Sequence, residues 1–286
     1  MGISMEVCIP FFLDLDSLRA CLDAVKRFAK PEHVLVNNAS PEIDITQICE
    51  DSELNYSVTV LTKTDHCACL DNLFSKSQSD TILVLDQDCL LTRPITPLLN
   101  QIEKGTVLLG PLDLFFVTGE HVKGQKIHNF VTRLTPLPGY IHACFMLMNA
   151  NVIRKKFGNT PFRYPLNIKL FGYGTLGAEP YFGITYYCRK AGLPIEFMFM
   201  LPGYYGTCAE LAYENMVYAV HLWYSSRIIG KKSKDFLDYA WEDGAGEDGC
   251  GRWLAGNVEV GWLQSEKQRF LEDYWNNKLK IKWGLP

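Results

Sequence analysis

The sequence predicts an α/β protein with a mixed, mainly parallel sheet flanked by helices. In the first part of the chain, short runs of β-branched and other apolar residues alternate with segments that repeat apolar residues at helical spacing. Strands that alternate with helices build a parallel sheet, because each helix returns the chain to the start of the next strand. The 286 residues are enough to bury a sizeable core.

The first part of the chain supplies these elements in regular order. The first helix repeats Leu and Val at helical spacing, Asp14 or Asp16 can cap its start, and Pro31 ends it. The fourth strand is apolar almost throughout, which is typical of a strand buried on both faces. The expected strands are 7–12, 33–38, 56–61 and 81–85, and the expected helices are 15–28, 45–49 and 68–75.

The second part of the chain is less regular, and a long loop interrupts it. Residues 110–139 are rich in Gly, Pro and His, and loops of that length in a compact domain are usually functional or mobile. A plain surface excursion is the other interpretation. The remaining expected elements are a helix ending at 103, a strand at 106–109, a turn, strand and cap over 138–149, helices at 151–157 and 180–191, strands at 194–200 and 217–223, and a helical tail from 228.

Asp86 and Asp88 stand one residue apart directly after the fourth strand. In an extended segment, side chains at i and i+2 point the same way, so both carboxylates could aim at one point beyond the carboxyl end of the strand. Open α/β sheets bind ligands at that edge. Two acids at one point repel each other unless a cation lies between them, and carboxylate oxygens suit Mg²⁺ or Mn²⁺. The alternative is that one Asp caps a helix and the other is solvated.

Composition and charge exclude several classes of protein. The net charge is −4 and no long basic run occurs, so we expect no nucleic-acid partner. The ten cysteines lack the spacing of a zinc site, which predicts reduced, mostly buried thiols in a reducing compartment. The chain starts without a signal-peptide pattern and has no apolar run long enough to span a membrane, so the expected location is cytoplasmic. A Gly-rich dinucleotide turn and a P-loop motif are both missing.

Four short segments carry a resemblance to a known family. They are 8–12 (Cys-Ile-Pro-Phe-Phe), 36–40 (Val-Asn-Asn-Ala-Ser), 70–72 (Leu-Asp-Asn) and 83–88 (Leu-Val-Leu-Asp-Gln-Asp). Their order and spacing resemble nucleotide-sugar-dependent glycosyltransferases of the GT-A fold, of the family 2 type, over roughly residues 5–225. In that family such segments are the opening strand, the second strand with its turn (usually with Asp where this chain has Asn), a helix under the nucleotide, and the L-D-x-D metal motif.

The resemblance implies roles for residues at one edge of the sheet. It implies a Rossmann-like GT-A fold in which a metal, Mn²⁺ or Mg²⁺, is held by Asp86, Asp88 and a late histidine, here His221. A lone His after an apolar run is also commonly a packing residue. The residues implied to contact the nucleotide are Pro10, Phe11, Asn38, Asn72, Asp86 and Gln87.

Glu179 is the candidate catalytic base. It follows the glycine-rich stretch 172–177 and precedes Pro180, which suits the first turn of a helix. The positive end of the helix dipole would keep its carboxylate ionised. In the family, a loop of this kind brings an Asp or Glu to the acceptor hydroxyl, although the usual acidic pair is here Ala-Glu-Pro, at 178–180. The alternative role for Glu179 is a helix-capping acid.

The resemblance implies a metal-dependent glycosyltransferase that moves a sugar from a UDP- or GDP-sugar to a glycan or another hydroxyl acceptor. One alternative is a nucleotidyltransferase, which normally needs an early Gly-rich loop with Lys or Arg that this chain lacks, and another is a non-catalytic nucleotide-sugar-binding module. The expected catalytic domain is 1–227, with a nucleotide-binding half at 1–105 and an acceptor half at 106–227. The helical extension, 228–286, could pack on this core, which is favoured, mediate a homodimer, or touch a membrane surface.

Overall fold

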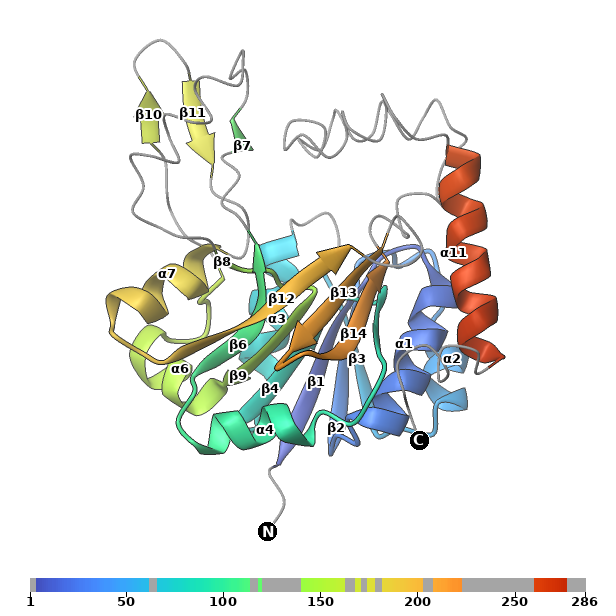
Figure 1. Cartoon of the computed structure of the whole chain (residues 1–286), viewed down its shortest axis with the longest axis horizontal. Helices are drawn as coiled ribbons and strands as arrows, with labels where there is room; N and C mark the ends of the chain where they lie inside the picture. Colours follow the sequence, from blue (N-terminus) through green and yellow to red (C-terminus); the bar gives the residue numbers. More distant parts are fainter. Residues whose placement is uncertain are drawn as a thin grey trace.

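An eleven-stranded sheet runs through the centre of the molecule (Figure 1). The structure is a computed structural model and describes residues 4–61, 66–113, 118–119, 140–162, 168–170, 174–177, 182–202, 208–222 and 260–276. The strand order is β3-β2-β1-β4-β9-β6-β12-β13-β14-β5, and β8 pairs with β6. The strands are β1 (Met5–Phe11), β2 (His33–Asn38), β3 (Tyr56–Val60), β4 (Thr81–Leu85), β5 (Cys89–Leu91), β6 (Leu108–Asp113), β8 (Tyr140–Ile141), β9 (Phe145–Asn149), β12 (Ile195–Pro202), β13 (Cys208–Tyr213) and β14 (Met216–Leu222).

Most strands of this sheet run in one direction, as the sequence predicts. β3, β2, β1 and β4 are parallel neighbours, and β6 and β12 form another parallel pair. The strands that run the other way, β9, β13, β5 and β8, are inserted between or beside them in the second part of the sheet. The predicted fold class, a mixed, mainly parallel α/β sheet, is therefore confirmed.

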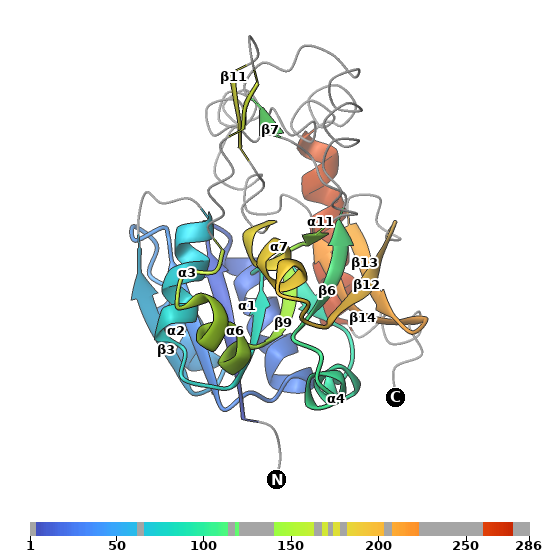
Figure 2. The same ribbon diagram turned by 90° about the vertical axis from the view of Figure 1, so that its left-hand side faces the viewer.

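Helices cover both faces of the sheet, and each face has its own core. Val7 and Ile9 of β1 pack toward α1, α2, α4 and α11, whereas Cys8 between them packs toward α3, α6 and α7. Figure 2 views the molecule from the side of α6 and α7. This alternation is what a strand buried on both faces requires. The helices are α1 (Leu15–Phe28), α2 (Thr46–Asp51), α3 (His66–Lys76), α4 (Thr96–Glu103), α6 (Ala150–Phe157), α7 (Phe182–Lys190) and α11 (Val260–Trp275).

The start of α1 shows which of the two candidate caps is used. The Asp14 carboxylate accepts hydrogen bonds from the backbone N–H and the hydroxyl of Ser17, at 3.1 Å and 2.6 Å. It thereby satisfies one of the free N–H groups that every helix start leaves over. Asp16 lies two residues after the N-cap, inside the first turn of α1, where it adds negative charge near the positive end of the helix dipole.

The bounds of two predicted strands in the second part of the chain differ from the structure. β6 does not end at 109 but continues to Asp113, and within it Gly110 leaves room for the backbone oxygen of Phe145, which would lie 2.5 Å from a Cβ at this position. The strand expected before the Asn149 cap is broken into β8 and β9. The break at 142–144 turns the Cys144 carbonyl toward the Asp86 N–H, which donates to it at 3.0 Å.

Two strands of the main sheet, β13 and β5, are not predicted from the sequence. β13 forms a hairpin with β14 through Glu214 and Asn215, which both have positive φ angles, 47° and 63°. Two such residues in succession are the geometry of a two-residue hairpin turn, for which Asn is a favoured residue. β5 has only three residues and gains its stability by pairing with β14.

A second, three-stranded sheet lies beyond one edge of the main sheet (Figures 1 and 2). Its strand order is β10-β11-β7, and all pairs are antiparallel. Part of the stretch 172–177, expected as a loop, thus forms a strand. The strands are β7 (Thr118–Gly119), β10 (Ile168–Leu170) and β11 (Gly174–Gly177).

The described part of the tail is a helix, α11, that packs alongside α1 (Figure 1). Phe270, Leu271 and Tyr274 are buried in the core on the α1 side of the sheet, and the Tyr274 hydroxyl donates to Asp23 at 2.8 Å. Among the described residues, no helix combines the length and apolar composition that crossing a membrane requires. Dimerisation and membrane contact of the tail remain predictions. Eight described cysteines are buried and form no disulfide, as expected: Cys8, Cys21, Cys49, Cys67, Cys69, Cys89, Cys144 and Cys188.

Candidate metal and nucleotide site

A tight turn after β4 brings Asp86 and Asp88 together. The Asp86 carbonyl accepts a hydrogen bond from the Cys89 N–H at 2.9 Å, so 86–89 form a β-turn rather than the extended segment that the sequence argument assumes. The two carboxylates converge because the chain turns, not because the strand continues. The turn lies at the carboxyl end of β4, on the edge where the sequence analysis expects ligands to bind.

His221 reaches this turn from β14, the late strand that pairs with β5. In this pairing His221 lies opposite Cys89, and the Leu222 N–H donates to the Asp88 carbonyl at 2.8 Å. A β-bulge where β14 passes Leu211 and Ala212 changes which residues face each side of the strand. Thr92 fixes this irregular stretch, because its N–H and hydroxyl both donate to β14 carbonyls, at 2.9 Å each.

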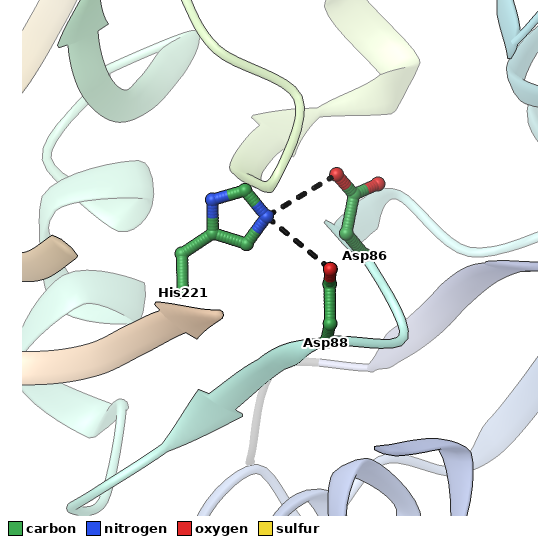
Figure 3. A group of neighbouring side chains, drawn as sticks. All are labelled: Asp86, Asp88 and His221. Carbon is green, nitrogen blue, oxygen red and sulfur yellow. Dashed lines mark ion pairs between the residues drawn. The ribbon is translucent and has the colours of Figure 1, made fainter. Parts of the chain in front are cut away.

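The three side chains meet at one point (Figure 3). Nε2 of His221 lies 3.2 Å from Oδ1 of Asp88 and 3.9 Å from Oδ2 of Asp86. One potential ligand atom from each residue lies within 4.8 Å of the others. The cluster therefore offers two carboxylates and one imidazole, a donor set suited to Mn²⁺ and similar ions.

The acids and histidines of this cluster shift one another's pKa values. Burial opposes ionisation of Asp86, but the imidazoles of His66, His221 and His142 outweigh it and hold the pKa of this carboxyl at about 2. Burial also lowers the pKa of His221, whereas the Cys144 sulfur and the Asp88 carboxylate raise it, and the net result is a pKa well above the usual range. The two acids therefore favour the protonated form of His221, and a metal ion would have to displace that proton.

Two further histidines lie beside this cluster, and the sequence analysis assigns a role to neither. His66 opens α3, and its Nε2 lies 3.3 Å from Oδ1 of Asp86. The His142 ring lies beside the His221 ring, tilted by 45° with centroids 5.8 Å apart, and its Nδ1 accepts from the Cys144 N–H at 3.1 Å. No local sequence pattern identifies either residue, because each reaches the cluster only when its own part of the chain packs against the acid turn.

Gln87 connects the acid turn to the end of β1. Its side-chain oxygen accepts from the Phe12 N–H at 2.6 Å, and its side-chain nitrogen donates to the Phe12 carbonyl at 2.7 Å. Gln87 therefore holds the turn against β1. The family resemblance implies a different role for Gln87, a contact with the nucleotide. Phe11 places its side chain in the core on the α1 side, and Pro10 next to it is partly exposed.

The predicted nucleotide contacts Asn38 and Asn72 lie near the ends of β2 and β3. The Asn38 side chain stabilises its own turn, accepting from the Ser40 N–H at 2.8 Å and donating to the Ile43 carbonyl at 2.9 Å. The Asn72 side-chain nitrogen donates to the Asn37 side-chain oxygen at 3.0 Å and to the Thr59 hydroxyl at 3.1 Å. The Asn72 amide is thus fixed by α3, β2 and β3 together.

Glu179, the candidate base, lies outside the described residues. The helix expected after it is described from Phe182 as α7, and Thr185 on this helix accepts from the Ile141 N–H of β8 at 3.0 Å. The catalytic role of Glu179 and the domain boundaries at 105 and 227 remain predictions.

The sequence places the chain in a known family. A family model described as "Glycosyl transferase family 2" matches residues 6–165, more than half of the chain. The chain therefore belongs to glycosyl transferase family 2, and its α/β sheet is the GT-A fold that the resemblance implies. A comparison with curated protein sequences gives no match.

Solved structures of other glycosyltransferases are similar to this chain at low sequence identity. One is glucosyl-3-phosphoglycerate synthase from Mycobacterium tuberculosis in complex with phosphoglyceric acid, with 13% identity over 53% of this chain and 59% of that one, and a TM-score of 0.38. Another is a mannosyltransferase from Pyrobaculum calidifontis in complex with GDP-Man and Mn²⁺, with 12% identity over 100% of this chain and 89% of that one, and a TM-score of 0.47. This chain thus spans less than two thirds of the mycobacterial enzyme's length.

Proposed function

We propose that this glycosyltransferase moves a sugar from a nucleoside diphosphate sugar, with UDP or GDP as the nucleotide, to an acceptor hydroxyl in a metal-dependent reaction. The observation that carries the proposal is the convergence of Asp86, Asp88 and His221 at the carboxyl edge of the sheet. The residues fit a divalent cation, because they combine carboxylate oxygens with one imidazole and place one potential ligand atom from each residue within 4.8 Å of the others.

In this proposal each part of the chain has a separate task. Asp86, Asp88 and His221 would hold Mn²⁺ or Mg²⁺, and such a cation offsets the charge that develops on a diphosphate leaving group. Gln87 keeps the acid turn fixed against β1, so that the carboxylates need not reorganise when the donor binds. If the reaction inverts the configuration of the sugar, Glu179 accepts the proton of the acceptor hydroxyl.

Thermal unfolding with a panel of ligands tests the proposal. Ligands that bind only the folded state raise its stability, by about 2.7 kcal/mol at 100 times Kd. UDP or GDP should raise the melting temperature in the presence of Mn²⁺ and much less in its absence. Release of UDP or GDP from the matching nucleotide sugar then measures transfer. A shift with nucleoside triphosphates, and none with diphosphates, would instead indicate a nucleotidyltransferase.

His221→Ala should weaken Mn²⁺ binding, and high Mn²⁺ concentrations should restore part of the activity. The variant removes the one imidazole of the cluster and leaves both carboxylates in place. Because the pKa of His221 is raised, Mn²⁺ binding to the parent should release a proton and tighten as the pH rises, whereas the variant should lose that pH dependence. Calorimetry in buffers of different ionisation enthalpy measures both effects. A parental Mn²⁺ titration curve from the variant would show His221 to be a packing residue.

A further inference from the structure

The carboxylate of Asp86 lies between two imidazoles. Its Oδ1 atom lies 3.3 Å from Nε2 of His66, and its Oδ2 atom lies 3.9 Å from Nε2 of His221. Figure 3 shows that Oδ2 is the oxygen turned toward His221 and Asp88. The contact with His66 is therefore made by the other oxygen, on the far side of the carboxylate from the three-residue cluster.

We propose that His66 is a positioning residue of this metal site, a proposal that rests on the metal-dependent function proposed above. The carboxylate torsion of an aspartate is broad, so the side chain alone does not fix which way its oxygens point. The outer oxygen of Asp86 is buried and lies 3.3 Å from Nε2 of His66. By holding Oδ1, His66 keeps Oδ2 directed at His221 and Asp88. Partners of this kind, which orient a metal ligand from outside, contribute about 10–100-fold in metal affinity.

His66 is suited to this role because it belongs to a firmly packed helix. It is the first residue of α3, which packs on β1 and β2 and buries Leu70, Leu73 and Phe74. The same helix carries Asn72, whose side chain is bonded to β2 and β3. The helix that is predicted to lie under the nucleotide thus also sets the orientation of a metal ligand. One helix, α3, therefore carries both Asn72, a predicted nucleotide contact, and His66, which holds Asp86.

A pair of substitutions at this position tests the proposal. His66→Ala removes the contact with Asp86, whereas His66→Gln keeps an N–H donor at a similar reach but removes the imidazole. His33→Ala is the matched control, because His33 also faces a carboxylate, Nδ1 to Oε1 of Glu6 at 3.5 Å, but at the opposite end of β2. Mn²⁺ affinity is measured for each protein by calorimetry, with UDP or GDP at saturating concentration, and circular dichroism checks folding.

We expect His66→Ala to weaken Mn²⁺ binding about 10–100-fold, His66→Gln to recover most of the loss, and His33→Ala to match the parent. Excess Mn²⁺ should restore transfer by His66→Ala, because the ligands themselves are intact. Parental Mn²⁺ affinity in His66→Ala overturns the inference and leaves the proposed function standing. Equal losses in the Ala and Gln variants also overturn it, since His66 would then bind the ion directly. A parent protein that does not bind Mn²⁺ overturns both proposals.

Discussion

Asp88→Asn should abolish the Mn²⁺ dependence of nucleoside diphosphate binding while leaving the fold intact. Asp88 is the acid closest to His221, at 3.2 Å, and it is buried. The substitution keeps the shape of the side chain but removes a charge from the cluster that would hold the cation. The effect should exceed the roughly 10–100-fold loss typical of residues that only orient a metal ligand. The fold should survive, because the Asp88 carbonyl, which accepts from the Leu222 N–H, is unchanged.

The measurement is calorimetric titration of UDP and GDP with and without Mn²⁺, together with thermal unfolding. Asp80→Asn is a matched control, because Asp80 is an exposed acid directly before β4, at the opposite end of the strand from the acid turn. It should bind nucleotides with the parental Mn²⁺ dependence. The assignment of Asp88 as a metal ligand would be wrong if Asp88→Asn showed that same dependence.

Glu179→Gln should reduce turnover by about 10²–10⁴-fold, the usual contribution of a general base. Glutamine keeps the shape of the side chain and removes its basicity. Donor binding should change little, since the donor is proposed to bind at the acid turn and the first part of the sheet. The prediction rests on sequence: Glu179 follows a glycine-rich stretch and precedes Pro180.

Single-turnover transfer and calorimetric donor binding, measured on the same protein, separate the possible roles of Glu179. Glu103→Gln, at the exposed end of α4, serves as the control for a glutamate away from the site. Transfer at the parental rate would rule out the base role. A loss of donor affinity as large as the loss of turnover would instead indicate a structural or donor-binding role.

The parts of the fold that the sequence predicts are those with local signals. Helix α1 shows apolar residues at helical spacing with a capping Asp, and β4 is a short apolar run, so both are predicted nearly to the residue. The hairpin strand β13 has no such signal, because Glu210 interrupts its apolar pattern. The break between β8 and β9 depends on the Asp86 N–H, which reaches Cys144 only in the folded protein.

The same distinction applies to the candidate site. Asp86 and Asp88 can be identified because they directly follow a buried strand, and His221 because it lies near the end of another. His66 cannot be found this way, since its approach to Asp86 depends on how α3 docks against β1 and β2. For Gln87 the sequence suggests a role that its contacts do not display. The family resemblance implies a contact with the nucleotide, whereas the Gln87 side chain is hydrogen-bonded to the Phe12 backbone.

The pairing of β14 with β5 has a consequence for how the protein matures. Thr92 and Val217 are joined by a hydrogen bond although 125 residues separate them, and His221 enters the cluster through this same pairing. While the chain is being synthesised, Asp86 and Asp88 leave the ribosome long before His221 does. Closing so large a loop is a slow and late step in folding. The cluster of Asp86, Asp88 and His221 therefore exists only in a chain whose late hairpin has docked, so metal capture would distinguish finished molecules from incomplete ones.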